Sequence, residues 1–220
     1  MHPGSLIDPK VQLTAHRFLS HDLVSGHACL DLVNTVTARD SSPHDWLVNH
    51  TALMQWAALT GRFDQGDLVK LSRRAAHNPA AAGRNLRRCK RLREVLHRIF
   101  AGCISARAPL KTDLADLDRF RIAAHSRLRG QVIAGRVCLQ PTLVAAGLEL
   151  ITDTLALEAL ELLRNLPDSR LRVCAGDDCG WLFHDRSRGA QRRWCDMATC
   201  GSNQKTRRFR GKERTGYVPQ

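Results

Sequence analysis

A chain of 220 residues with 43% hydrophobic residues can bury a core of ordinary size, which excludes a disordered tail or linker. Charged and polar residues are spread through the first twenty positions, and no stretch approaches the roughly 18 apolar residues of a membrane span. We therefore expect no secretory signal and a cytoplasmic protein without membrane contact. The formal net charge is +13; where it is concentrated it favours a nucleic-acid partner, with a solvated, soluble surface as the alternative.

Apolar residues recur at three- to four-residue spacing in six segments, which predicts a mostly helical fold. A loop or a short strand is expected near 18–23, before the first of these segments. The predicted helices cover 28–35, 46–59, 67–76, 84–103, 114–125 and 143–165. The last is the longest and is expected to lie at the centre of the core.

The segment 84–103 combines an apolar stripe with many arginines. An amphipathic helix whose arginines form a solvated face is the simplest interpretation, and a second nucleic-acid contact is the alternative. Residues 129–139 lack the helical spacing of the other segments. Gly130 and Gly135 lie among β-branched residues there, so we predict a β-hairpin. Pro167 marks the expected boundary between a first domain, 1–166, and a second, 170–214.

Four cysteines in the second domain form two C-x4-C pairs separated by fifteen residues: Cys174, Cys179, Cys195 and Cys200. Two short-spaced cysteine pairs match the four tetrahedral thiolate ligands of one structural Zn²⁺ ion. His184 is a rival ligand, but four thiolates already complete the tetrahedron. We expect Trp181, Phe183 and Trp194 to pack around the site as its miniature core, with base stacking as the alternative.

Positive charge is concentrated around and after these cysteines. Residues 170–220 hold twelve Lys and Arg against five Asp and Glu, which gives +7. A basic helix that begins within the second cysteine pair would suit phosphate contacts, with base readout by Asn or Arg side chains. The nucleic-acid-binding candidates are Arg188, Arg192, Arg193, Asn203, Lys205, Arg207, Arg208, Arg210 and Lys212.

The cysteine segment resembles the CGNR-type zinc finger of bacterial proteins, which follows an ABATE domain. The likeness rests on Cys174-x4-Cys179-Gly180-Trp181-Leu182-Phe183 and Arg192-Arg193-Trp194-Cys195-x-Met197-x-x-Cys200-Gly201. Leu30-Asp31-Leu32-Val33-Asn34-Thr35 looks like the N-terminal element of the same family. Where the family's name implies Cys-Gly-Asn-Arg, this chain has Cys200-Gly201-Ser202-Asn203.

The resemblance implies an α+β fold: a mostly helical ABATE-like regulatory or sensor domain with a few short strands, and a small treble-clef- or ribbon-like finger made of a β-hairpin and a helix. It also implies DNA binding and transcriptional regulation. The leading hypothesis is a regulator, not an enzyme, whose finger binds DNA while the N-terminal domain senses a small ligand or mediates assembly, for example as a homodimer.

The rival hypothesis is a small-molecule-binding protein or enzyme in which zinc is purely structural. Asn34, Thr35 and Arg39 could meet the carboxylate or phosphate of a small anionic ligand, and Asp31 could act as a base. The alternative for these residues is structural: Asn34 and Thr35 would satisfy a helix end, and Arg39 would form a surface ion pair. An adaptor that binds RNA or protein through its basic arm is a further possibility.

Overall fold

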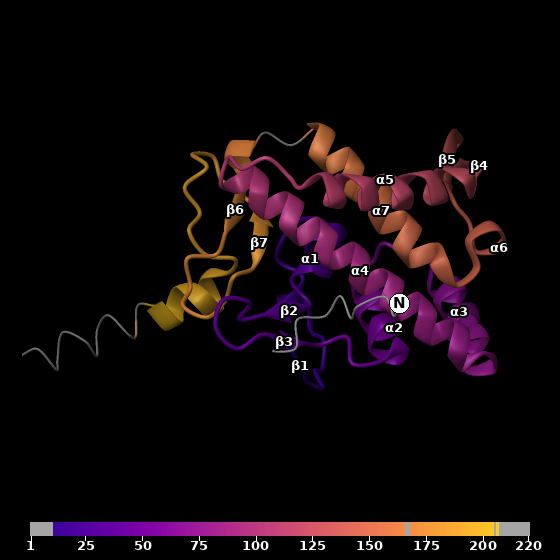
Figure 1. The fold of residues 1–220 in the computed structure, drawn as a ribbon, viewed down its shortest axis with the longest axis horizontal. Coiled ribbons are helices and arrows are strands. Elements are labelled where there is room, and N and C mark those ends of the chain that lie inside the picture. Colours follow the sequence, from indigo (N-terminus) through magenta and orange to yellow (C-terminus); the bar gives the residue numbers. More distant parts are fainter. Residues whose placement is uncertain (1–10, 166–167, 205, 207–220) are drawn as a thin grey trace, which may run out of the picture.

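The computed structural model describes residues 11–165, 168–204 and 206, and within them the chain has the predicted α+β fold (Figure 1). Seven α-helices are described in this part of the chain: α1 (Ala28–Val33), α2 (His50–Leu59), α3 (Gln65–His77), α4 (Pro79–Ile104), α5 (Lys111–Ser126), α6 (Leu143–Ala146) and α7 (Leu150–Asn165). Short 3-10 turns lie at Ser20–Asp22, Gly147–Glu149 and Asp168–Arg170. None of the described helices is long and apolar enough to cross a membrane.

Helix α4 is the longest described helix, with 26 residues, and it runs diagonally through the body of the molecule (Figure 1). Its start follows from the sequence, because the Asn78 side chain caps the backbone amide of Ala81 at 2.9 Å and Pro79 occupies the first turn. Most of the predicted stripe is buried, including Cys89, Leu92 and Phe100. Helix α4 shares the centre of the core with the segment that the sequence placed there, since Ile151, Leu155 and Ala156 are fully buried in the same cluster.

The prediction of one continuous helix over 143–165 was wrong. Gly147 adopts a left-handed φ of +55°, and the chain breaks there into α6, a 3-10 turn and α7. Glycine reaches this conformation without the steric penalty that other residues incur. An apolar run on both sides of the glycine concealed the break.

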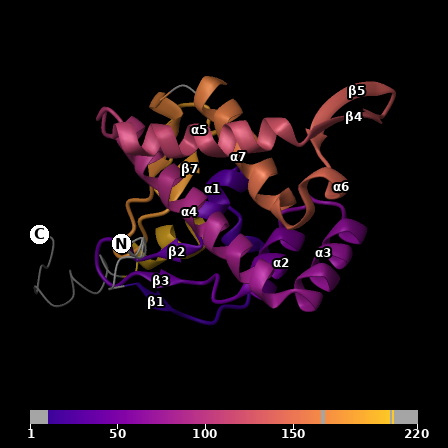
Figure 2. The same cartoon turned by 45° about the vertical axis from the view of Figure 1, so that its right-hand side comes forward.

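Three small sheets complete the fold in the part of the chain that the structure describes. Strands β1 (Gln12–Leu13), β3 (His44–Asp45) and β2 (Val36–Thr37) form one sheet in that order. Strands β4 (Leu128–Ile133) and β5 (Arg136–Pro141) form the predicted hairpin, which turns at Ala134 and Gly135, both at positive φ, and projects from the body in Figure 2. Strands β6 (Leu171–Val173) and β7 (Leu182–His184) pair in the cysteine-rich segment.

The cysteine-rich segment packs directly on the N-terminal helices. Leu171 and Leu182 belong to the same buried cluster as the cores of α1, α4 and α7. The Asn34 side chain, at the end of α1, donates to the carbonyl oxygen of Leu182 at 2.9 Å and accepts from its amide at 2.8 Å. A side-chain amide thus pairs with β7 as a neighbouring strand would, and it fixes the finger against α1.

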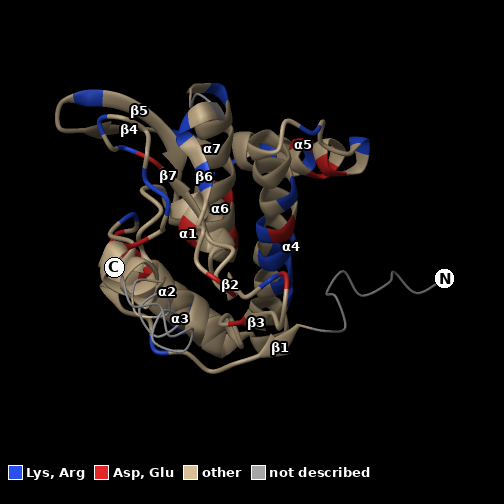
Figure 3. Ribbon diagram, turned by 90° about the vertical axis from the view of Figure 1, so that its left-hand side faces the viewer, with Lys and Arg blue, Asp and Glu red and all other residues tan. Residues whose placement is uncertain are grey.

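The arginines predicted to form the solvated face of α4 are exposed or half-buried, as expected, and several of them pair with acids of neighbouring segments. Figure 3 shows blue along much of α4 with red close by. Arg88 pairs with Glu149, Arg91 with Asp116 and Arg98 with Asp113, at 2.6–3.0 Å. Lys90 and Arg93 are buried against Asp45. These ion pairs neutralise much of the positive charge of α4, so less of it is available to attract a nucleic acid.

Candidate metal centre and nucleic-acid interface

The sulfur atoms of Cys174, Cys179, Cys195 and Cys200 meet in one cluster, all within 4.8 Å of one another. Sγ of Cys195 lies 3.7 Å from that of Cys179 and 3.6 Å from that of Cys200. A tetrahedron with Zn–S bonds of about 2.3 Å has edges of about 3.8 Å, whereas a disulfide needs about 2.05 Å. The cluster therefore fits one structural zinc ion.

The backbone around the cluster is shaped for thiolates. The amides of Gly176 and Cys195 point at the sulfur of Cys174, at 3.4 and 3.2 Å. Such N–H···S contacts stabilise negative charge on a ligating sulfur. A Cβ at Gly176 would lie 3.2 Å from Sγ of Cys200, closer than ordinary van der Waals contact, so a larger residue would require the cluster to shift by a few tenths of an ångström.

Aromatic residues cover the site as the sequence predicted. Trp181 and Phe183 are buried in one cluster with three of the cysteines, and Trp194 packs against it. Trp46 of the N-terminal domain meets Trp181 edge to face, with ring centroids 5.7 Å apart. His184 lies outside the sulfur cluster, and its Nδ1 is 3.0 Å from Nε2 of His27. His184 thus has a partner in the N-terminal domain.

The second cysteine pair opens a helical segment, also as predicted. The Asp196 side chain caps the amide of Thr199 at 2.9 Å, and a π-helix over Met197–Gly201 continues as α-helix through 202–204. Asn203 is exposed on this segment. The predicted contacts at Lys205, Arg207, Arg208, Arg210 and Lys212 lie outside the described residues.

The three predicted arginine contacts of the finger differ in their surroundings. Arg188 and Arg193 are exposed, and the Arg193 guanidinium lies 5.3 Å from the ring centroid of Trp194. Arg192 is half-buried over Phe183 and donates to the carbonyl oxygens of Val24, Trp194 and Cys195. Arg192 therefore holds the finger together, and Arg188 and Arg193 are the surface cations.

The three residues predicted to bind an anionic ligand have partners within the protein. Asn34 is 2% exposed, and its side-chain amide makes two hydrogen bonds to the backbone of β7. The Thr35 hydroxyl donates to the carbonyl oxygen of Leu32 and accepts from Arg93. Arg39 pairs with Glu94 at 2.7 Å, largely buried and not at the surface. These contacts support the structural interpretation of the three residues.

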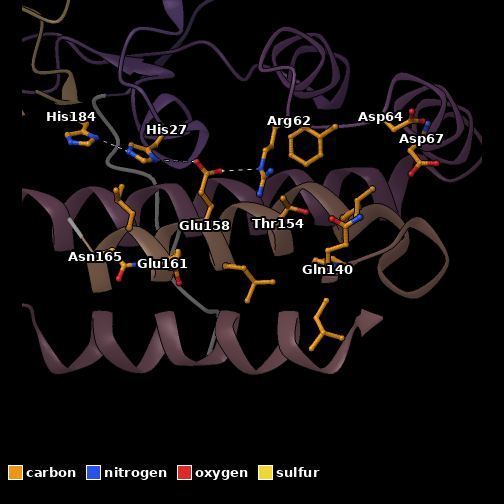
Figure 4. A pocket seen from close by; sticks show the side chains of 16 residues that line it. His27, Arg62, Asp64, Asp67, Gln140, Thr154, Glu158, Glu161, Asn165 and His184 are labelled. Carbon is orange, nitrogen blue, oxygen red and sulfur yellow. Dashed lines mark hydrogen bonds and ion pairs between the residues drawn. The ribbon is translucent and has the colours of Figure 1, made fainter. Parts of the chain in front are cut away.

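A cleft of about 520 Å³ that no sequence motif indicated lies between α7, the loop that joins α2 to α3, and β5 (Figure 4). In Figure 4, His184, His27, Glu158 and Arg62 form a continuous chain of contacts along one side. Burial, with Arg186 and His184 nearby, lowers the pKa of His27 to about 4, so its imidazole is neutral at neutral pH. A smaller hollow of about 300 Å³ shares His27, Arg62 and Glu158 and adds Asp31.

Asp31 provides a pH-dependent test of this region. Burial raises the pKa of Asp31 to about 6 despite its hydrogen bond from Ser25, so the folded state binds the proton more tightly than the unfolded state. Stability is therefore lost as pH rises from 3.8 to about 6. We expect Asp31→Asn, which keeps an acceptor for Ser25, to stabilise the protein at pH 7 by at most about 3 kcal/mol.

Urea unfolding of Asp31→Asn and the parent chain at pH 3.5 and pH 7 measures this difference. The gain should vanish at the lower pH, and the exposed control Asp40→Asn should show little change at either. An equal gain for Asp31→Asn at both values would contradict the assignment.

Comparison with protein families agrees with the geometry. A model of the CGNR zinc finger matches residues 170–213, and the ABATE model, described as "Putative stress-induced transcription regulator", matches residues 26–166. None of the curated proteins compared with the chain matches it. Because the ABATE match alone spans more than half of the chain, the protein belongs to the ABATE family and carries a C-terminal CGNR zinc finger.

Proposed function

We propose that this protein is a DNA-binding transcription regulator, in which the zinc finger contacts DNA and the N-terminal domain senses a small ligand. The supporting observation is the placement of surface cations on the finger. Arg188 and Arg193 are exposed on the finger, and the chain continues from the helical segment at 202–204 into a strongly basic sequence. The family description points to the same class of function.

The chemistry of these residues favours phosphate contacts over base readout. Arginine guanidinium groups bind phosphate oxygens in a sequence-independent manner. Asn203 has the amide that can pair with adenine, and its exposure on the helical segment is compatible with that role. Affinity is therefore expected to come from the arginines and any sequence preference from the helical segment.

The packing of the two domains supplies a route for regulation. Asn34 binds the backbone of β7, and His27 meets His184 on the same strand. A ligand that shifts α1 or α7 would therefore move β7 and the finger. Regulation in this scheme is a change in the position of the finger and not in its metal site.

Binding to duplex DNA should depend steeply on salt. If about five phosphates are neutralised, log K against log [salt] should have a slope of roughly −4.5. We expect Arg188→Ala with Arg193→Ala to make this slope less steep by roughly two and to weaken binding to all sequences alike. Fluorescence anisotropy of a labelled duplex at several salt concentrations measures both effects.

A matched variant loses two exposed cations on α3, Lys70→Ala with Arg73→Ala, and should leave the slope unchanged. Deletion of 201–220 should remove most of the affinity, and duplex DNA should compete better than RNA. Absence of binding at low salt, or preference for RNA, would overturn the proposal.

A further inference from the structure

We propose that the cleft between α7, the α2–α3 loop and β5 binds a small organic cation, an amine that carries an apolar body. This inference names the class of ligand that the N-terminal domain would sense. A regulatory role for the ligand therefore rests on the proposed function. The volume of about 520 Å³ falls within the roughly 300–1,000 Å³ range of small-molecule sites. The residues that line it specify the chemistry.

The charge of the cleft is opposite to that of the chain. Four carboxylic acids and one arginine line it, which gives a formal charge of −3 with neutral histidines, whereas the whole chain carries +13. The acids are Asp64, Asp67, Glu158 and Glu161. A concave site of negative charge attracts cations and repels the polyanion that the finger is proposed to bind.

Glu158 is the acid placed to receive an ammonium group. Its Oε1 accepts from the amide of Ala28 at 2.9 Å, at the start of α1. Its buried Oε2 has no hydrogen-bond partner within the described part of the chain and lies 3.9 Å from Nε of Arg62, whose side chain is 56% exposed. Displacement of the exposed Arg62 side chain would open this oxygen to a donor in the cleft, which would complete the carboxylate with a charge-assisted hydrogen bond.

Other residues of the cleft supply additional acceptors and an apolar wall. Thr154 and Glu161 follow the same side of α7 as Glu158 and face the cleft in Figure 4. Phe63, Leu150, Leu157 and Leu162 line it as well. A carboxylate beside aromatic and aliphatic side chains suits an ammonium group attached to a hydrocarbon body.

The position of the cleft connects such a ligand to the finger. His184 of β7 lines the cleft and contacts His27, whose Nδ1 lies 3.8 Å from Glu158. An amine at Glu158 therefore touches the group that holds α1 and the histidine pair that joins α1 to β7. Occupancy of the cleft would bias the position of β7.

Titration calorimetry of the full-length protein with three probes of one shape tests the charge requirement: phenethylamine, 3-phenylpropionate and 2-phenylethanol. We expect one phenethylamine to bind per chain, with the neutral alcohol weaker by about tenfold or more and the anion not binding. Hexylamine should bind as phenethylamine does. Binding of neither amine at millimolar concentration, or equal binding of the anion, would overturn the inference.

Two variants locate the site. Glu158→Gln and Glu161→Gln should each weaken phenethylamine binding by about tenfold. The second change is at an exposed position and retains the fold if the first does not. Asp118→Asn removes an exposed acid from α5, outside the cleft, and should leave the affinity unchanged. Unaltered affinity in both glutamate variants would place the ligand elsewhere and overturn the inference.

The calorimetry contains no DNA, so its outcome is separate from that of the proposed function. DNA binding without amine binding would overturn this inference and leave the DNA-binding proposal standing. Amine binding without DNA binding would overturn the DNA-binding proposal and leave this inference standing.

Discussion

Removal of zinc is expected to unfold the finger and to loosen its contact with the N-terminal domain. Among the described residues the finger's own core is small, since Trp181 and Phe183 are its large buried side chains and the four cysteines form most of the rest. In comparable metal-dependent modules zinc binding supplies on the order of 10 kcal/mol of folding free energy. Without the ion, four thiols would lie within 4.8 Å of one another with nothing to hold them together.

The consequence should extend beyond the metal site. Leu171 and Leu182 belong to the core of the N-terminal domain, and Asn34 binds the backbone of β7. If β7 leaves, the Asn34 amide exchanges two hydrogen bonds with the protein for hydrogen bonds with water, at a net cost of roughly 0.5–1.5 kcal/mol each. Chelation should therefore lower the unfolding midpoint of the helical domain as well.

Elemental analysis, near-ultraviolet circular dichroism and thermal unfolding test this expectation together. The parent chain should contain one zinc per chain, and Cys195→Ser should lose both the metal and the tryptophan signal of the finger. Cys138→Ser, on β5 and outside the sulfur cluster, is the matched control and should keep both. A metal-free chain with an unchanged tryptophan signal would contradict a structural role for zinc.

The parts of the structure that depend on local spacing could be predicted from the sequence. The cysteine spacing predicted the sulfur cluster, and Gly135 beside β-branched residues predicted the β4–β5 hairpin. The apolar stripe of 84–103 predicted most of α4. Gly61 and Pro167, residues that commonly follow a helix, predicted where α2 and α7 end.

The parts that depend on long-range contacts could not be predicted. Asn34 and Leu182 are 148 residues apart, and nothing near either residue indicates the other. The same holds for the cleft, because His27, Arg62 and Glu158 come from three separate segments and no motif includes them. Arg93 has the same spacing pattern as the exposed arginines of α4, and only the position of β3 shows that it is buried.

Asp45 is the centre of a buried ionic cluster that joins β3 to α4. Its carboxylate is fully buried, 2.7 Å from Nζ of Lys90 and 2.7 and 2.9 Å from the two terminal nitrogens of Arg93, and it also accepts from the amide of Leu47 at 2.9 Å. Glu94 takes a further bond from Arg93, and Arg39 binds Glu94. Burial alone would raise the pKa of Asp45, but the hydrogen bonds and charges of Arg93 and Lys90 lower it below its usual value.

Loss of this carboxylate should be among the most destabilising single changes in the protein. Asp45→Ala leaves Lys90 and Arg93 buried with one neighbouring acid, Glu94, and an uncompensated buried charge costs about 3–5 kcal/mol. Arg93→Met should cost less, because Asp45 keeps Lys90 as its partner and methionine fills part of the space. Urea unfolding at pH 7 measures both changes, with Asp40→Ala as the exposed control. A cost below about 1 kcal/mol for Asp45→Ala would show that the two cations find other partners or reach water, since exposed pairs contribute no more than that.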